Sequence, residues 1–275
     1  ESIKVFQADH APQQVTLQVA GEEKVEPLKK AVQSLPSSTV KLSPQKIAYN
    51  TIQTENKKIR NKKVQIHRLS IPRGETFKVV LSDGTEVLLN SDSRLSYPTV
   101  FKGKERVVSL EGEAYFNVTK NTEHPFIVKS GNVQVRVLGT EFNMCSYTPD
   151  NVRVTLIEGK VAVSDTCGLQ TVEMKPGQSA QLSSNGTFAV KEVDIESFLY
   201  WKEGFFYFDD VALVDMMKEI GRWYNIDIEF RNSKIMDLRM HFFANRHQDI
   251  FHLIELLNRM ERIHAHFETG KLIIE

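Results

Sequence analysis

Residues 64–193 carry hydrophobic and polar side chains in alternation, in short runs rich in Val, Phe, Tyr and Thr. A period of two places alternate side chains on opposite faces, so each run predicts a half-buried β-strand. Turn-forming dipeptides separate the runs; they include Asp83-Gly84, Gly131-Asn132, Pro176-Gly177 and Asn185-Gly186. Many short strands at this spacing predict a mainly β fold, either a β-sandwich or jelly roll or a β-helical roll.

Residues 1–63 carry a weaker version of the same pattern. QQVTLQVAG (13–21) and STVKLSPQKIAYN (38–50) read as strands joined by a polar loop at 21–38. The basic run NKKIRNKK (56–63) has no interleaved aromatic residues, so we interpret it as a solvated connector rather than a nucleic-acid surface. We therefore place residues 1–200 in one β-rich domain.

The pattern changes after residue 205, where strands alternate with two helical periodicities. FFYF (205–208), IDIEF (226–230) and RMHFFAN (239–245) predict strands, and IHAHF and KLIIE (263–275) predict a closing hairpin. The first helix should begin at an Asp209 or Asp210 cap. Its apolar face would carry Leu213, Met216, Met217, Ile220 and Trp223, and that of the second helix Ile250, Leu253, Ile254, Leu257 and Met260.

The two halves of this tail match at an offset of 37 residues. The matched pairs are all apolar; they are Phe206 with Phe243, Leu213 with Ile250, Met216 with Leu253, Met217 with Ile254, Ile220 with Leu257, Trp223 with Met260, Ile226 with Ile263 and Phe230 with Phe267. The offset indicates a duplicated β-α-β unit. We predict a small α+β domain at 201–275, with one sheet covered on one side by both helices. The Met and aromatic stripe is then core.

Composition excludes some classes of function. The 275 residues balance 35 basic against 35 acidic side chains, which gives no reason to expect a nucleic-acid partner. No apolar run approaches the roughly 20 residues that cross a bilayer, and the start ESIKVF has no features of a signal peptide. A hairpin at 147–151 would set Cys145 opposite residue 153 rather than Cys167, which favours free thiols over the one disulfide that two cysteines permit.

Glu111 and Glu113 are the strongest candidates for enzymatic chemistry. On one strand their side chains share a face about 6.8 Å apart, a spacing compatible with the paired carboxylates of a glycosidase. Catalytic carboxylates normally converge from different segments, however, and here both would lie on one solvated face. The alternative is a bulge or close backbone approach at Gly112, with both glutamates at the rim, and we favour this structural interpretation.

No other motif points to an enzyme, a cofactor or a metal. G-x-S-x-G, Walker A, G-x-G-x-x-G and H-E-x-x-H are all absent. His264 and His266 share a strand face and could chelate together, but two ligands do not complete a site. We therefore expect an outward polar face there, no metal and no cofactor.

One peptide bond has a chemistry of its own. VRVLGTEF (135–142) places Gly139 before Thr140 inside a strand. A Thr hydroxyl can attack the preceding carbonyl and move the acyl group from nitrogen to oxygen, which leaves a hydrolysable ester. Glycine on the carbonyl side tolerates the strained geometry that this step needs.

Several long phrases resemble a known family. IPRGETFKVV (71–80), VVSLEGEAYFNV (107–118), HPFIVKSGNVQVRVLGTEFNM (124–144) and VTLIEGKVAV (154–163) resemble the periplasmic part of FecR-like transmembrane anti-sigma factors. WKEGFFYFDDVALVDMMKEIGRWYNIDIEF (201–230) resembles the carboxy-terminal domain that these proteins carry in Bacteroidetes-type bacteria. That domain is similar to the short secretin/TonB amino-terminal fold, a doubled β-α-β unit. Residues 1–63 match only loosely.

The resemblance implies a signalling role and no enzymatic activity. A cytoplasmic domain would bind an ECF-type sigma factor, and one membrane helix would follow; both would precede Glu1. The periplasmic part would then dock the signalling domain of an outer-membrane TonB-dependent transporter, and a membrane protease could take part. Some members cut themselves at a Gly-Thr bond, which the resemblance places at Gly139-Thr140.

The tail should dock its partner by adding a strand to an open sheet edge. We expect the edge at 271–275, with Lys271, Leu272, Ile273 and Ile274, or the edge at 239–245, with Met240 and Phe242.

A glycan-binding β-sandwich is the alternative function. Tyr97, Tyr115 and Phe116 would then stack on sugars. The duplicated tail argues against it, because a lectin does not need such a domain.

Overall fold

The computed structural model describes residues 2–11, 13–34, 40–49, 64–149, 151–183 and 186–275. They form two compact units, described separately below. The β unit comprises residues 14–72 and 76–195, and the tail unit comprises residues 1–13, 73–75 and 196–275. The basic run 56–63 lies outside the described residues. Of the helices in the described part of the chain, none is long and apolar enough to cross a membrane.

The β unit is built almost entirely from strands, as the alternating pattern predicts. Its elements are β2 (Thr16–Val19), β3 (Val25–Pro27), α1 (Leu28–Ser34), β4 (Val40–Ser43), β5 (Lys46–Tyr49), β6 (Ile66–Ser70), β7 (Phe77–Val80), β8 (Glu86–Leu89), β9 (Arg94–Pro98), β10 (Arg106–Asn117), β11 (Phe126–Ser130), β12 (Val133–Val137), β13 (Glu141–Ser146), β14 (Arg153–Glu158), β15 (Val161–Asp165), β16 (Thr171–Met174), β17 (Gln178–Leu182) and β18 (Phe188–Glu192).

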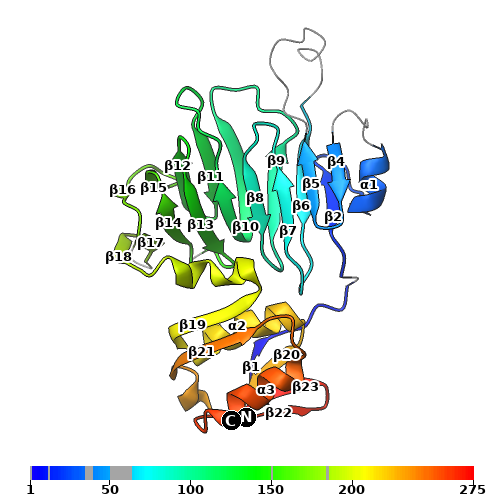
Figure 1. The fold of residues 1–275 in the computed structure, drawn as a ribbon, viewed down its shortest axis with the longest axis vertical. Helices are drawn as coiled ribbons and strands as arrows, with labels where there is room; N and C mark the ends of the chain where they lie inside the picture. Colours follow the sequence, from blue (N-terminus) through cyan, green and yellow to red (C-terminus); the bar gives the residue numbers. More distant parts are fainter. Residues whose placement is uncertain (1, 12, 35–39, 50–63, 150, 184–185) are drawn as a thin grey trace. The chain divides into compact units, whose positions relative to one another are not determined.

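These strands form two layers that share β10 (Figure 1). One layer has the order β3-β2-β6-β9-β10-β11-β12-β15-β16. The other has the order β4-β5-β7-β8-β10-β13-β14-β17-β18. Successive hairpins after β10 alternate between the layers, so the sheet curls on itself as a roll. The predicted mainly β class is confirmed.

Strand β10 changes layer at Gly112. Its first half, up to Glu111, pairs with β9 and β11, and its second half pairs with β8 and β13. Gly112 has φ +96°, and a Cβ there would lie 2.8 Å from the Cα of Ser93. Only glycine permits both this conformation and this backbone approach. The predicted close approach at Gly112 is therefore present.

The core between the layers is mostly apolar, and a buried polar cluster joins the layers near β5, β6 and β9. Tyr49 lies on β5 in one layer, whereas His67 and Tyr97 lie on β6 and β9 in the other. The Tyr49 hydroxyl is 2.6 Å from His67 Nδ1 and 3.0 Å from the Tyr97 hydroxyl. All three side chains are buried. Burial disfavours the imidazolium form and lowers the pKa of His67 to about 4.

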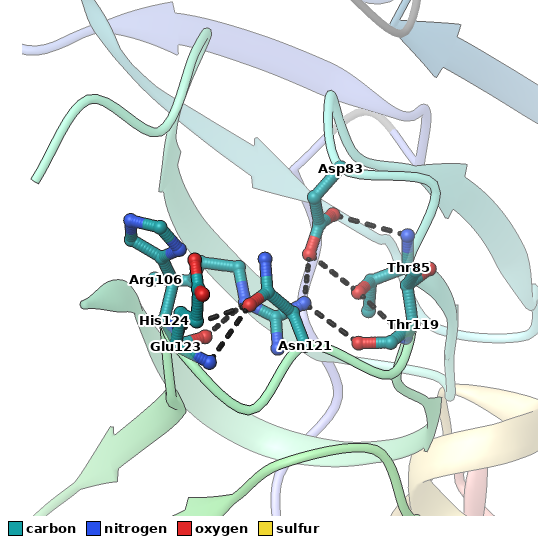
Figure 2. A network of polar contacts seen from close by, with 7 residues as sticks. All are labelled: Asp83, Thr85, Arg106, Thr119, Asn121, Glu123 and His124. Atoms are coloured by element: carbon teal, nitrogen blue, oxygen red, sulfur yellow. Dashed lines mark hydrogen bonds and ion pairs between the residues drawn. The ribbon is translucent and has the colours of Figure 1, made fainter. Parts of the chain in front are cut away.

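A second buried network holds the loop that follows β10 (Figure 2). Arg106 Nη1 donates to Asp83 Oδ2 at 2.7 Å and to the Thr119 carbonyl at 2.9 Å, and Nε donates to the His124 carbonyl at 2.8 Å. The guanidinium carbon lies 5.3 Å from the centre of the Phe126 ring. Arg106 is only 3 % exposed, so its charge is stabilised by these partners rather than by water.

Further hydrogen bonds support Asp83 and the loop. Thr85 donates its amide and hydroxyl to Asp83, at 3.0 and 2.7 Å. Asn121 Oδ1 accepts from the amides of Glu123 and His124, as Figure 2 shows. The loop 118–125 is therefore fixed at both ends and at its tip.

The tail unit contains β1 (Ile3–Phe6), η2 (Glu196–Phe198), η3 (Tyr200–Glu203), β19 (Phe205–Ala212), α2 (Leu213–Tyr224), β20 (Asp227–Phe230), η4 (Ser233–Ile235), β21 (Arg239–Asn245), α3 (Ile250–Arg259), β22 (Ala265–Glu268) and β23 (Lys271–Ile274). Both repeats thus run strand, helix, strand. Except for Phe243, their matched apolar residues from β19 to β22 fall in or against one core, to which both helices contribute.

Three expectations about the tail are wrong. Its strands form two sheets rather than one: β19 pairs with β21, and β1-β20-β23-β22 forms the second sheet. The first strands of the repeats pair with each other, while β23 inserts between the second strands. The helix cap is also different. Asp209 and Asp210 lie at a bulge in β19 and contact His241 and Arg239, and α2 begins after Ala212, which has no side-chain cap.

The third correction concerns the first residues of the chain. We expected residues 1–63 to belong to the β-rich domain, but Ile3–Phe6 form the edge strand of the four-stranded tail sheet. Phe6 fills a space that Gly221 leaves on α2, where a Cβ would lie 2.7 Å from the Phe6 ring. The Arg73 guanidinium stacks over the same ring at 4.7 Å. An isolated four-residue strand carries no signal of which sheet it will join.

We predict an acid-sensitive component of stability at His67. The unfolded pKa is about 6.5 and the folded pKa about 4, so folding excludes the imidazolium. Stability should fall as pH drops below about 6.5 and level off below about 4, by about 3 kcal/mol in total. Hydrogen exchange of the β6 and β9 amides would measure it. His67→Asn should lack this component, and exposed His10→Asn should keep it; an unchanged slope in His67→Asn contradicts the assignment.

We predict that Arg106→Met lowers the free energy of unfolding by about 3–5 kcal/mol, because it leaves the Asp83 carboxylate buried without its cation. Arg136→Met is the matched control, since Arg136 pairs with Glu105 on the surface, both 42 % exposed. That change should cost less than about 1 kcal/mol. Urea denaturation followed by circular dichroism measures the free energy of unfolding of both variants. If both lost the same amount, burial of the Arg106–Asp83 pair would not increase its contribution to stability.

Candidate functional site

The bond between Gly139 and Thr140 lies where β12 ends and β13 begins. Gly139 has φ +153°, and a Cβ there would lie 2.6 Å from the Cα of Lys120. The loop that Arg106 holds is therefore packed directly on this glycine. Two backbone hydrogen bonds flank the contact: Asn121 N donates to the Leu138 carbonyl at 2.7 Å, and Val118 N donates to the Thr140 carbonyl at 3.1 Å.

Thr140 is 5 % exposed, and its hydroxyl is oriented by the neighbouring hairpin. Oγ1 donates to the Lys160 carbonyl at 2.9 Å. Gly159 approaches closely, since a Cβ there would lie 2.9 Å from Thr140 Oγ1. A carbonyl oxygen can orient a hydroxyl but cannot accept its proton permanently. Attack on the Gly139 carbonyl by an Oγ1 lone pair therefore needs another group to accept this proton.

The two glutamates on β10 do not form a pair. Glu111 is exposed and lies 3.3 Å from Arg94 and 3.6 Å from Arg68. Glu113 is 7 % exposed, and its carboxylate accepts from Asn90 at 2.8 Å and Asn143 at 2.9 Å. The expectation of one shared solvated face is wrong, because β10 changes layer at Gly112 between them. Each carboxylate has a structural partner.

The aromatic residues of the glycan alternative are not available for stacking. Tyr97 and Phe116 are 1 % and 0 % exposed. Tyr115 is half-buried and donates its hydroxyl to Glu141 at 2.6 Å. A pocket of about 410 Å³ in the β unit is lined mainly by apolar residues such as Ile66, Pro98 and Phe101, and neither glutamate of β10 lines it. Cys145 and Cys167 are not joined by a disulfide in the described structure.

Of the two predicted docking edges, the one at 271–275 is not an edge. Strand β23 lies inside the four-stranded sheet, parallel to β20 and antiparallel to β22. Leu272, Ile273 and Ile274 are all buried. Lys271 donates to Glu229 at 2.6 Å, and this hydrogen bond holds the pKa of Glu229 below its ordinary value. The hairpin pattern in the sequence predicts the pairing of β23 with β22, but it does not predict the parallel pairing of β23 with β20.

The edge at 239–245 remains open in the described part of the tail unit, where β21 pairs only with β19. The side chains we proposed there are not available: Met240 is 0 % and Phe242 8 % exposed, and both belong to the core. The outward apolar side chain of β21 is Phe243, which is 53 % exposed. Its ring stacks on Phe205 with centroids 5.1 Å apart.

Sequence reasoning missed Phe243 because it was assigned to the repeat. Phe243 matches Phe206 at the 37-residue offset, and Phe206 is fully buried. In the fold, however, Phe206 faces Ala244 in the ladder and Phe243 faces Tyr207. The strict alternation within 239–245, with Met240, Phe242 and Ala244 buried, was the signal that places Phe243 outward.

Known protein families match a segment in each of the two units. The family described as FecR protein matches residues 67–162, and the one described as FecR, C-terminal matches residues 205–274. No curated protein matches the chain in sequence.

Solved structures give a match along most of the chain. Two crystal structures, at 1.65 and 2.50 Å resolution, of a candidate anti-sigma factor from Parabacteroides distasonis ATCC 8503 are similar, with TM-scores of 0.70 and 0.69 and identities of 27 % and 26 %. Each match covers 76 % of this chain and 98 % of the other. The chain therefore belongs to the FecR family of anti-sigma factors.

Proposed function

We propose that this chain is the periplasmic sensing region of a single-pass anti-sigma factor. It relays substrate occupancy of an outer-membrane TonB-dependent transporter to an ECF-type sigma factor, which a cytoplasmic domain outside this chain would bind. The support is the order of the two family matches, FecR protein followed by FecR, C-terminal, in one chain. A membrane protease acting on the segment near the bilayer would complete the relay.

The transporter's signalling domain docks on the tail unit at β21. The free edge of a strand offers unpaired N–H and C=O groups that an extended segment of a partner can pair with. Of the sheet edges in the described tail, β21 is the one that also carries a large exposed aromatic residue, Phe243. Exposed aromatic side chains supply most of the affinity at many interfaces.

The self-cleavage reaction belongs to the β unit. Thr140 Oγ1 would attack the Gly139 carbonyl carbon, the C–N bond would break, and the hydroxyl proton would pass to the Thr140 nitrogen. Water would then hydrolyse the ester, leaving a Gly139 carboxylate and a Thr140 with a free amine and hydroxyl. The close backbone packing at Gly139, which leaves no space for a Cβ, and the burial of Thr140 support this assignment.

The two products would remain assembled in the native protein. Strand β12, before the bond, pairs with β11 and β15, and strand β13, after it, pairs with β10 and β14. The cut would remove one covalent bond but none of these ladders. A pulling force or a local opening could then separate the halves, which suits a relay that ends in release.

We predict that Phe243→Asp weakens docking by about tenfold or more, because it removes the aromatic anchor beside the β21 edge. Isothermal titration calorimetry with the purified signalling domain of the transporter encoded beside this protein would measure the change. Phe251→Asp is the matched control, since Phe251 is 68 % exposed on α3. Phe251→Asp should leave the affinity unchanged. If Phe251→Asp weakened docking and Phe243→Asp did not, the docking surface would lie on α3.

We predict that Thr140→Val abolishes cleavage, because it keeps the shape of the side chain and removes the nucleophile. Thr140→Ser keeps the hydroxyl and should still cut. A denaturing gel and intact mass spectrometry of the purified proteins would show the fragments, since the native halves stay paired. If Thr140→Val still gave two fragments, one ending at Gly139 and the other beginning at position 140, the reaction would be excluded.

A further inference from the structure

Three potential metal ligands meet at the end of the four-stranded tail sheet. His264 and His266 flank Ala265, which is buried in the core, so both histidines lie on the opposite face of the sheet. Glu275 lies across the ladder from His264. Their backbones exchange two hydrogen bonds, His264 N to the Glu275 carbonyl at 2.7 Å and Glu275 N to the His264 carbonyl at 2.9 Å. The ladder thus fixes the relative position of all three side chains.

The ligand atoms of these residues are close together. One atom from each of His264, His266 and Glu275 lies within 4.8 Å of the other two. Neighbouring ligands of a tetrahedral zinc ion are about 3.4 Å apart, given bonds of about 2.0–2.1 Å. Small rotations of exposed or half-buried side chains close this difference. The two imidazole rings already stack with centroids 5.1 Å apart.

One nitrogen in the cluster lacks a hydrogen-bond partner. His266 Nδ1 is buried and makes no hydrogen bond to the described residues. Its nearest carboxylate oxygen is Glu275 Oε1, at 3.8 Å. A buried polar nitrogen without a partner is destabilising, and a metal ion between Nδ1 and the carboxylate would satisfy it.

Two charged side chains, Glu268 and Arg231, lie beside the cluster. Glu268 lies 3.7 Å from His266 Nε2 but is bound by Arg231, which removes it from the ligand set. Arg231 also lies 3.7 Å from Glu275 Oε2, whereas Oε1 is the carboxylate oxygen 3.8 Å from His266 Nδ1. Oε1 is therefore the oxygen that we assign to the metal ion.

We propose that His264, His266 and Glu275 bind one divalent transition-metal ion, with Zn²⁺ as the best match. Two imidazoles and one carboxylate form a ligand set typical of zinc sites that keep an open coordination position. Water or a group from a docked molecule would occupy that position. The sequence shows only the His-x-His pair; the third ligand is brought in by the pairing of β22 with β23.

The test is calorimetric titration of Zn²⁺ into the full 275-residue chain without an affinity tag. We expect one ion per chain and a higher melting temperature in its presence, since binding stabilises only the folded state. Co²⁺ in place of Zn²⁺ should give the absorption bands of a low-coordinate nitrogen and oxygen site. Glu275→Gln and His266→Ala should each weaken Zn²⁺ binding by about tenfold or more.

His252→Ala is the matched control, because His252 lies on α3, away from the cluster, and beside a carboxylate, Glu255, at 3.9 Å. It should bind Zn²⁺ like the unaltered chain. Absence of binding by the unaltered chain would overturn the proposal, and so would equal binding by Glu275→Gln, which preserves the shape of the residue it replaces. The docking experiment with Phe243→Asp is independent of either result.

Discussion

The β unit depends on the backbone approach between Gly112 and Ser93, because it lets one strand serve two layers. Strand β10 pairs with β9 and β11 before this point and with β8 and β13 after it. At this place the two layers of the curled sheet are connected by β10 itself. Any side chain at position 112 would collide with the Ser93 backbone and strain φ, so the crossing needs glycine.

Two clusters of buried polar side chains also stabilise this arrangement of strands. The Tyr49, His67 and Tyr97 cluster ties β5 of one layer to β6 and β9 of the other. Arg106, at the start of β10, holds both ends of the loop 118–125, and this loop packs on Gly139. The geometry at the Gly139-Thr140 bond is thus linked to the same strand that joins the layers. Such networks favour one arrangement because another strand pairing would take these partners away from buried polar groups, among them the charged Arg106.

In the tail unit, a duplicated sequence forms sheets in which the strand pairing is not duplicated. The two helices and their apolar faces follow the 37-residue repeat. The strands do not, because β23 and β1 are additions that have no counterpart in the repeat. They cover both edges of β20, and β23 also covers one edge of β22, whereas β21 pairs only with β19 in the described part of the separate two-stranded sheet. The His264, His266 and Glu275 cluster is a result of the pairing of β22 with β23.

The sequence by itself determined the local elements: the β-rich region, the two helices of the tail, the repeat and the glycine at which β10 bends. These follow from periodicity and from single-residue conformational preferences, which act within a few residues. Only the tertiary structure decided that Glu111 and Glu113 face different surroundings, that residues 3–6 join the tail and that β23 is interior. It also decided that Glu275 lies beside two histidines. Strand pairing is set by contacts between residues far apart in the chain, and a short alternating segment is compatible with many partners until the whole core is packed.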